Sequence, residues 1–99
     1  MAGYEQILQA VYDGVREVNE MDSDLKLPEA PDTAILGDGS QLASLSIVAL
    51  ATVTEESIDK AFDKSVSVID IFMAVDTPSL DVAGLAERIA KRIGCPVPG

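Results

Sequence analysis

A glycine-rich turn leads into a strongly apolar segment in the stretch GDGSQLASLSIVAL, residues 37–50. Glycine at this density opposes regular structure, whereas the run after Leu42 is apolar on almost every side. The pattern predicts that a connection ends near residue 40 and that a helix covers residues 43–61. Ser44 then lies at the exposed start of that helix. One side of the helix is expected to carry Leu45, Val48, Ala49, Thr52 and Val53, so the helix is either central or has an exposed apolar patch for a partner.

The segment before this turn is predicted to be a helix followed by a long connection. Over residues 3–20, one face collects apolar side chains at helical spacing, namely Tyr4, Ile7, Leu8, Val11, Tyr12, Val15 and Val18. Proline and glycine then interrupt residues 21–40, which predicts an irregular connection. Four apolar residues are expected to pin this connection to the core: Leu25, Leu27, Ile35 and Leu36.

The segment after residue 61 predicts two further helices. Residues 65–68 alternate like a strand but have no evident partner, so we expect a loop there and a short helix over 69–74. Asp81 is a suitable N-cap for a last helix over 82–93, and Gly94 is a suitable terminator. The chain is therefore expected to be a single all-α domain over residues 1–99. We expect a four-helix antiparallel bundle with its core over 4–93 and a flexible tail over 94–99.

Composition excludes several classes of function. Seventeen acidic residues against seven basic ones give a net charge of −10, which disfavours nucleic acid and anionic membranes and favours partners with basic patches. The chain has one cysteine, Cys95, and no histidine, so we expect no disulfide, no metal site and a reducing, cytoplasmic location. The start of the chain does not resemble a signal peptide, and no apolar run is long enough for stable membrane insertion.

Ser44 has two interpretations on general grounds. A serine at a helix start commonly caps the free backbone amides. As a nucleophile it needs a base, and a chain without histidine offers no usual one, so we expect no enzyme activity of its own. An exposed serine of this kind suits modification by a separate protein.

The stretch LASLSIVAL, residues 42–50, resembles the serine motif of acyl and peptidyl carrier proteins. Leu36-Gly37 before the motif, the acidic residues after it, Phe62, Ile71-Phe72 and the segment 81–89 also match that family, so the resemblance spans residues 4–93. Ala43 stands where the family usually has Asp, and the segment from Ser44 to Phe62 is about one turn longer than usual. The first difference points either to a specialised carrier with its own transferase or to one that common transferases modify poorly. The second indicates an extended helix or following loop.

The resemblance implies a covalent 4'-phosphopantetheine on Ser44, attached by a phosphopantetheinyl transferase. The arm would hold acyl groups as thioesters for synthases, ligases and acyl-transferring enzymes of fatty-acid, lipid or polyketide biosynthesis. The resemblance also implies a monomeric carrier. The residues expected to bind partners are Leu45, Ile47, Ala51, Glu55, Glu56 and Asp59.

Several alternatives stay open at this level. The three acidic residues either dock partners or form a solvated helix face. Val48, Ala49, Val53, Leu85 and Ile89 either fill the core or line an acyl cavity. The rival function is a small acidic module that binds a basic partner helix without any prosthetic group.

Overall fold

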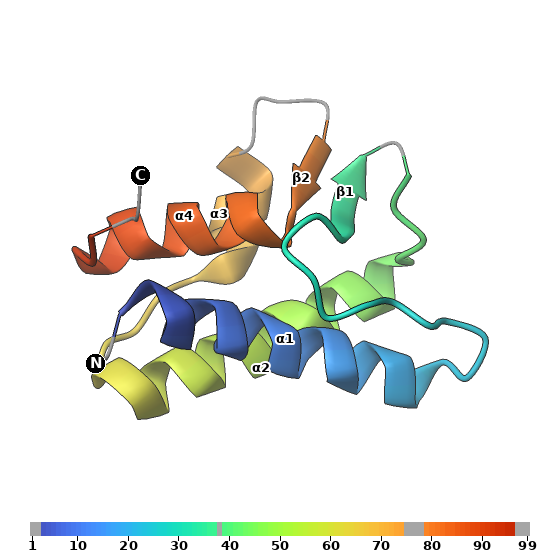
Figure 1. Cartoon of the computed structure of the whole chain (residues 1–99), viewed down its shortest axis with the longest axis horizontal. Coiled ribbons are helices and arrows are strands. Elements are labelled where there is room, and N and C mark those ends of the chain that lie inside the picture. Colours follow the sequence, from blue (N-terminus) through green and yellow to red (C-terminus); the bar gives the residue numbers. More distant parts are fainter. Residues whose placement is uncertain (1–2, 38, 75–78, 97–99) are drawn as a thin grey trace.

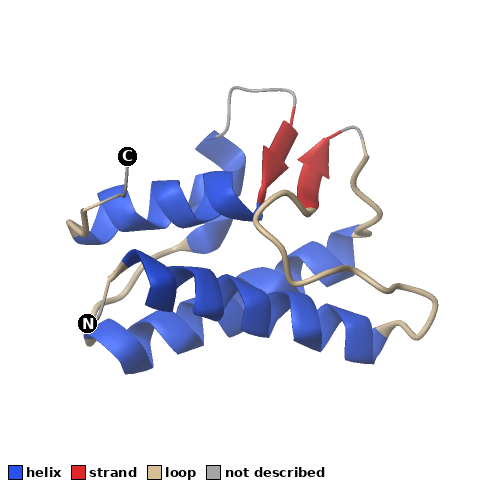
Figure 2. Ribbon diagram, in the orientation of Figure 1, coloured by secondary structure: helices blue, strands red, loops and turns tan. Residues whose placement is uncertain are grey.

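The computed structural model describes residues 3–37, 39–74 and 79–96. Within these ranges the chain forms, in order, α1 (Tyr4–Met21), β1 (Ala34–Gly37), α2 (Ser44–Phe62), α3 (Val68–Ala74), β2 (Ser79–Asp81) and α4 (Val82–Ile93). Figures 1 and 2 show α1 and α2 side by side and antiparallel, with α4 on the other side of α1 and the two strands beside the start of α4. The expected small, mainly helical domain with four helices is confirmed, and each helix begins and ends within a residue or so of its prediction.

The core is aliphatic and lies between the helices. The apolar stripes of α1 and α4 face each other, as their spacing predicted. The largest fully buried side chains of these stripes are Ile7, Val11, Val15 and Val18 on α1 and Val82, Leu85 and Ile89 on α4. No helix in the described part of the chain is both long and apolar enough to cross a bilayer.

Helices α1 and α2 approach each other closely at Gly14. A Cβ atom on Gly14 would lie 2.8 Å from the Thr54 hydroxyl oxygen and 2.9 Å from the Leu50 carbonyl oxygen. These separations are shorter than a normal contact, so only glycine fits without moving the helices apart. The Thr54 side chain at this crossing is fully buried, and its hydroxyl has no hydrogen-bond partner among the described residues.

The face that α2 buries is not the side on which Leu45, Val48, Ala49, Thr52 and Val53 align. The side chains that α2 buries are Ser46, Leu50, Ala51, Thr54 and Ile58. Leu45 is 79% exposed and Val48 is 50% exposed, so the helix has an exposed apolar patch. Because the first half of α2 is apolar nearly all round, its periodicity does not select a face. The close contact with Gly14 selects it instead.

A two-stranded antiparallel sheet, absent from the all-α prediction, joins the first connection to the segment before α4. Ala34 pairs with Asp81, Leu36 with Leu80 and Gly37 with Ser79, with an irregularity between the first two pairs. Strands of three and four residues carry almost no local signal of their own. The sequence pattern therefore could not reveal a pairing between such distant segments.

The start of α4 is held by this same connection. The amides of Val82 and Ala83 donate to the carbonyl oxygens of Thr33 and Pro31, at 3.0 and 2.9 Å. The Asp81 carboxylate accepts from the Gly84 amide at 2.8 Å, which confirms the predicted N-cap. Three amides that a helix start usually leaves unpaired are therefore satisfied.

The long first connection is ordered by side-chain hydrogen bonds as well as by burial. The Asn19 amide group donates to the Leu27 carbonyl and accepts from the Leu27 amide, at 2.9 and 3.0 Å. Leu25 and Ile35 are buried in the core, as expected, and Leu27 and Leu36 pack against it. At the other end of the chain, Gly94 terminates α4 in the left-handed conformation, as predicted. Residues 97–99 of the expected tail lie outside the described residues.

Candidate functional site

The turn that leads into α2 is fixed to β1. Gly37 and Gly39 both have φ of 89°, a left-handed conformation that glycine adopts without strain. The Ser40 hydroxyl donates to the Ile35 carbonyl at 2.6 Å and accepts from the Leu42 amide at 3.2 Å. The start of α2 is thus tied to the sheet rather than left on a loose loop.

Ser44 is the first residue of α2 and is exposed. The N-cap position belongs to Ala43, whose carbonyl accepts the first helical hydrogen bond from Ile47 at 3.0 Å. Ser44 is therefore not the capping residue, and this general interpretation of the serine was wrong. Its hydroxyl has no hydrogen-bond partner among the described residues, which leaves the oxygen available to another molecule.

The start of α2 is electropositive for two reasons. Alanine at the N-cap offers no side-chain acceptor, so the first-turn amides keep unpaired N–H groups. The first turn also contains no acidic residue that would offset the positive end of the helix dipole. A negatively charged group on the Ser44 oxygen would be stabilised there.

The exposed apolar surface beside Ser44 consists of Leu45 and Val48, one turn apart on α2. Ile47 is partly buried, whereas Ala51 is fully buried and cannot belong to a partner-facing patch. The expectation for Ala51 was therefore wrong, because α2 turns this residue into the core. Val48, which the sequence pattern assigned to the interior, takes part in the exposed patch instead.

The acidic residues of α2 divide into two groups. Glu56 and Asp59 are exposed, whereas Glu55 is partly buried. A carboxylate oxygen of Glu55 accepts from the Val68 amide at 2.8 Å, at the first residue of α3. This contact satisfies one of the free amides of α3 and places a negative charge at its positive end. Glu55 therefore has a structural role that its sequence position did not reveal.

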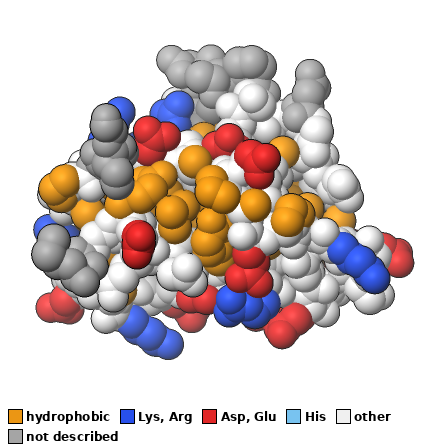
Figure 3. Space-filling model, in the orientation of Figure 1, with side chains coloured by type: hydrophobic (Ala, Val, Ile, Leu, Met, Phe, Trp, Pro, Cys, Tyr) orange, Lys and Arg blue, Asp and Glu red, His pale blue; other side chains and the backbone are white. Residues whose placement is uncertain are grey.

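The structure places the candidate acyl-cavity residues in different surroundings. Leu85 and Ile89 are fully buried in the core. Val53 borders an open groove between α1 and α2, together with Asp13, Glu17 and Lys60. Val48 is half exposed near the start of α2. In the surface view of Figure 3, hydrophobic side chains form a band across one face, with acidic and basic side chains around it.

No family model matches the chain, and neither the curated proteins nor the solved structures contain a significantly similar one.

Proposed function

We propose that the protein is an acyl carrier protein that holds acyl intermediates on a 4'-phosphopantetheine arm attached to Ser44. The observation that carries the proposal is the exposed Ser44 hydroxyl at the first position of α2, beside exposed apolar residues. The sequence resemblance of residues 42–50 to the carrier motif and the four-helix fold support it. In this proposal the fold is a bundle of the acyl-carrier type.

The residues at the start of α2 fit such a group chemically. The hydroxyl is free to form a phosphodiester, and the charge of that phosphodiester would lie beside unpaired amides. The chain contains no histidine to act as a base for Ser44, so a phosphopantetheinyl transferase would have to supply the activation. When bound, the arm supplies a thiol that carries the acyl group as a thioester.

Partner enzymes would approach the same end of α2. Leu45 and Val48 provide an apolar centre, and Glu56 and Asp59 provide negative charge further along the helix. Exposed ion pairs contribute up to about 1 kcal/mol each, so the apolar contacts would contribute most of the affinity. The acidic residues would steer transferases, synthases and ligases that carry basic patches.

The direct test is the intact mass of the chain after incubation with coenzyme A and a broad-range phosphopantetheinyl transferase. We expect a gain of one phosphopantetheine on the peptide that contains Ser44, and no gain in Ser44→Ala. Ser65→Ala is the matched control, because Ser65 is also exposed but lies in the loop before α3. A folded wild-type chain that several transferases leave unmodified would overturn the proposal.

A second candidate function uses the same surface without a prosthetic group. It is favoured by Ala43, which stands where the carrier family usually has Asp, and by the exposed Leu45 and Val48. The protein would then be an acidic module that binds a basic amphipathic helix. An unloaded chain would have to bind such a helix, and Leu45→Ala would have to weaken that binding.

A further inference from the structure

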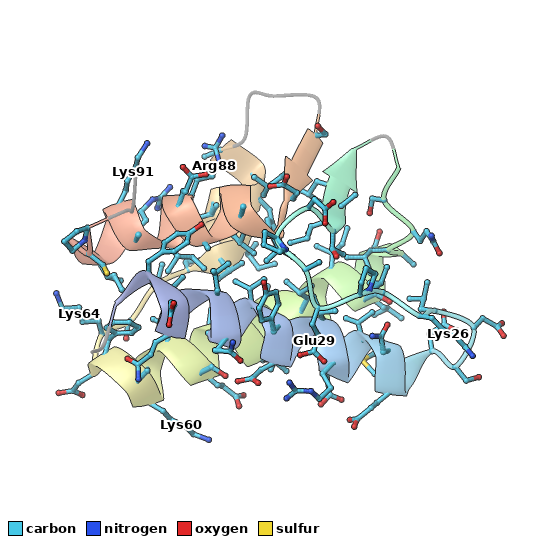
Figure 4. All side chains as sticks on the ribbon, in the orientation of Figure 1. Lys26, Glu29, Lys60, Lys64, Arg88 and Lys91 are labelled. Atoms are coloured by element: carbon cyan, nitrogen blue, oxygen red, sulfur yellow. The ribbon has the colours of Figure 1, made fainter. Side chains whose placement is uncertain are left out.

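Helix α4 differs in charge from the rest of the chain. It carries Arg88, Lys91 and Arg92, three of the seven basic residues, and only one of the seventeen acidic residues, Glu87. Spacings of three and four residues place the three cations along one face of the helix. Figure 4 shows the labelled Arg88 and Lys91 side chains on the same side of α4, pointing away from α1.

These three side chains border a cleft of about 660 Å³ between α3, β2 and α4. Ile71 and Leu80, both nearly fully buried, form its apolar floor. Three acidic residues, Asp32, Asp81 and Glu87, also line the cleft. The volume is in the range of small-molecule sites.

The charged side chains that line the cleft form no ion pair with one another among the described residues. Among the described residues, the only basic side chain within 4.0 Å of a carboxylate is Arg16, which pairs with Asp13 and Glu29. The acidic lining residues lie mainly toward the start of α4, where the Asp81 carboxylate is engaged with the Gly84 amide. The cationic residues lie toward its end, so one half of the cleft presents unpaired positive charge.

The helix dipole accounts for only part of this cluster. Lys91 and Arg92 lie in the last turn of α4, where cations are favourable. Arg88 lies one turn earlier, is partly buried and faces the cleft. In addition, the Lys64 ammonium already donates to the Ile93 carbonyl at 2.8 Å at that helix end. A purely structural role therefore leaves the position of Arg88 unexplained.

We propose that this cleft binds a small organic phosphate, whose phosphoryl group contacts Arg88, Lys91 and Arg92 and whose organic part lies on Ile71 and Leu80. Three unpaired cations match a phosphate dianion better than a single carboxylate. Arginine also binds phosphate oxygens in pairs. The cleft is larger than a bare phosphate ion needs, and its apolar floor suits an organic substituent. The site does not depend on any modification of Ser44.

The test is a titration of the full, unmodified chain with phenyl phosphate, followed by amide chemical shifts. We expect saturable shifts around the cleft with a dissociation constant of about 1 mM or tighter, and weaker binding of inorganic phosphate. The double substitution Arg88→Gln with Arg92→Gln should weaken binding by about tenfold or more. Lys60→Gln is the matched control, because it removes one exposed cation from α2, and it should leave binding unchanged. Ser44→Ala should also bind normally.

Three results would overturn the proposal. The first is the absence of saturable shifts in a chain that is folded. The second is binding that survives the double substitution. The third is binding to vesicles of anionic lipid without binding to phenyl phosphate, which would identify α4 as a membrane contact instead.

Discussion

Ala43 occupies the N-cap of α2 with extended backbone angles, φ −80° and ψ 167°, and gives the helix no side-chain cap. The substitution Ala43→Asp would place a carboxylate where it can accept from a first-turn amide. A side-chain cap in place of alanine stabilises a protein by about 1 kcal/mol. The favourable interaction of the new charge with the helix dipole adds roughly 0.3–1 kcal/mol. In a chain of this size, each kcal/mol raises Tm by about 4–8 °C.

The assay is urea unfolding followed by circular dichroism, with Ala43→Asn as the uncharged capping control. Both variants should have higher midpoints than the wild type, with unchanged slopes. Capping lowers the pKa of the introduced carboxyl in the folded state, because the amide and the dipole favour its charged form. The extra stability of Ala43→Asp over Ala43→Asn is therefore fully present above the pKa that the introduced carboxyl has in the unfolded chain. It is lost as pH falls through the lower pKa of that carboxyl in the folded chain. If neither variant were more stable than the wild type, Ala43 would not be the N-cap of α2.

The same pair of variants separates stability from modification. If the protein is a carrier, a carboxylate beside Ser44 should speed loading by a transferase that has a basic docking surface. Ala43→Asn, which caps the helix without the charge, should not. Equal loading rates for both variants would show that helix capping, rather than charge, limits modification.

Three further substitutions test the packing around α2. Gly14→Ala should gain about 1 kcal/mol of helix propensity. Its Cβ would, however, lie 2.9 Å from the Leu50 carbonyl oxygen, so we expect the free energy of unfolding in urea to fall by roughly 1–2 kcal/mol. Thr54→Val removes a buried hydroxyl without a partner among the described residues and should stabilise the chain by about 1 kcal/mol; destabilisation would indicate a hidden partner. Glu55→Ala should cost about 1 kcal/mol and speed amide exchange at Val68, whereas the exposed neighbour Glu56→Ala should do neither.

The helices were predictable because their signals are local. The stripe of α4, its Asp81 cap and its Gly94 terminator lie within a few residues of one another, and the prediction of residues 82–93 matches the structure. The prediction of residues 3–20 for α1 is displaced by one residue at each end. Each of these signals depends on neighbouring side chains, so no knowledge of the tertiary structure was needed.

The missed features depend on contacts between distant segments. The pairing of Ala34 with Asp81 has no local alternation that would reveal it. The rotation of α2 is set by its contact with Gly14 on α1, and it buries Ala51 while exposing Val48. At the candidate site, the position of Ser44 at the helix start was therefore predictable. Which apolar residues are exposed beside Ser44 was not predictable.

The sheet between β1 and β2 has a consequence for the order in which the molecule assembles and opens. Its first pair joins residues 34 and 81, so forming it in an otherwise unfolded chain would close a loop of more than 40 residues. The length-dependent part of that closure costs roughly 3–4 kcal/mol of chain entropy, which a few backbone hydrogen bonds of about 1 kcal/mol each barely offset. The strands are therefore stable only after the helices have brought their ends together.

The sheet is consequently expected to form late in folding and to open early, as a unit smaller than the whole domain. The Ser40 hydroxyl, in the turn before α2, donates a hydrogen bond to the Ile35 carbonyl of β1. Opening of the sheet would therefore also loosen the backbone that precedes Ser44. The mobility of the serine would then be governed by residues almost forty positions further along the chain.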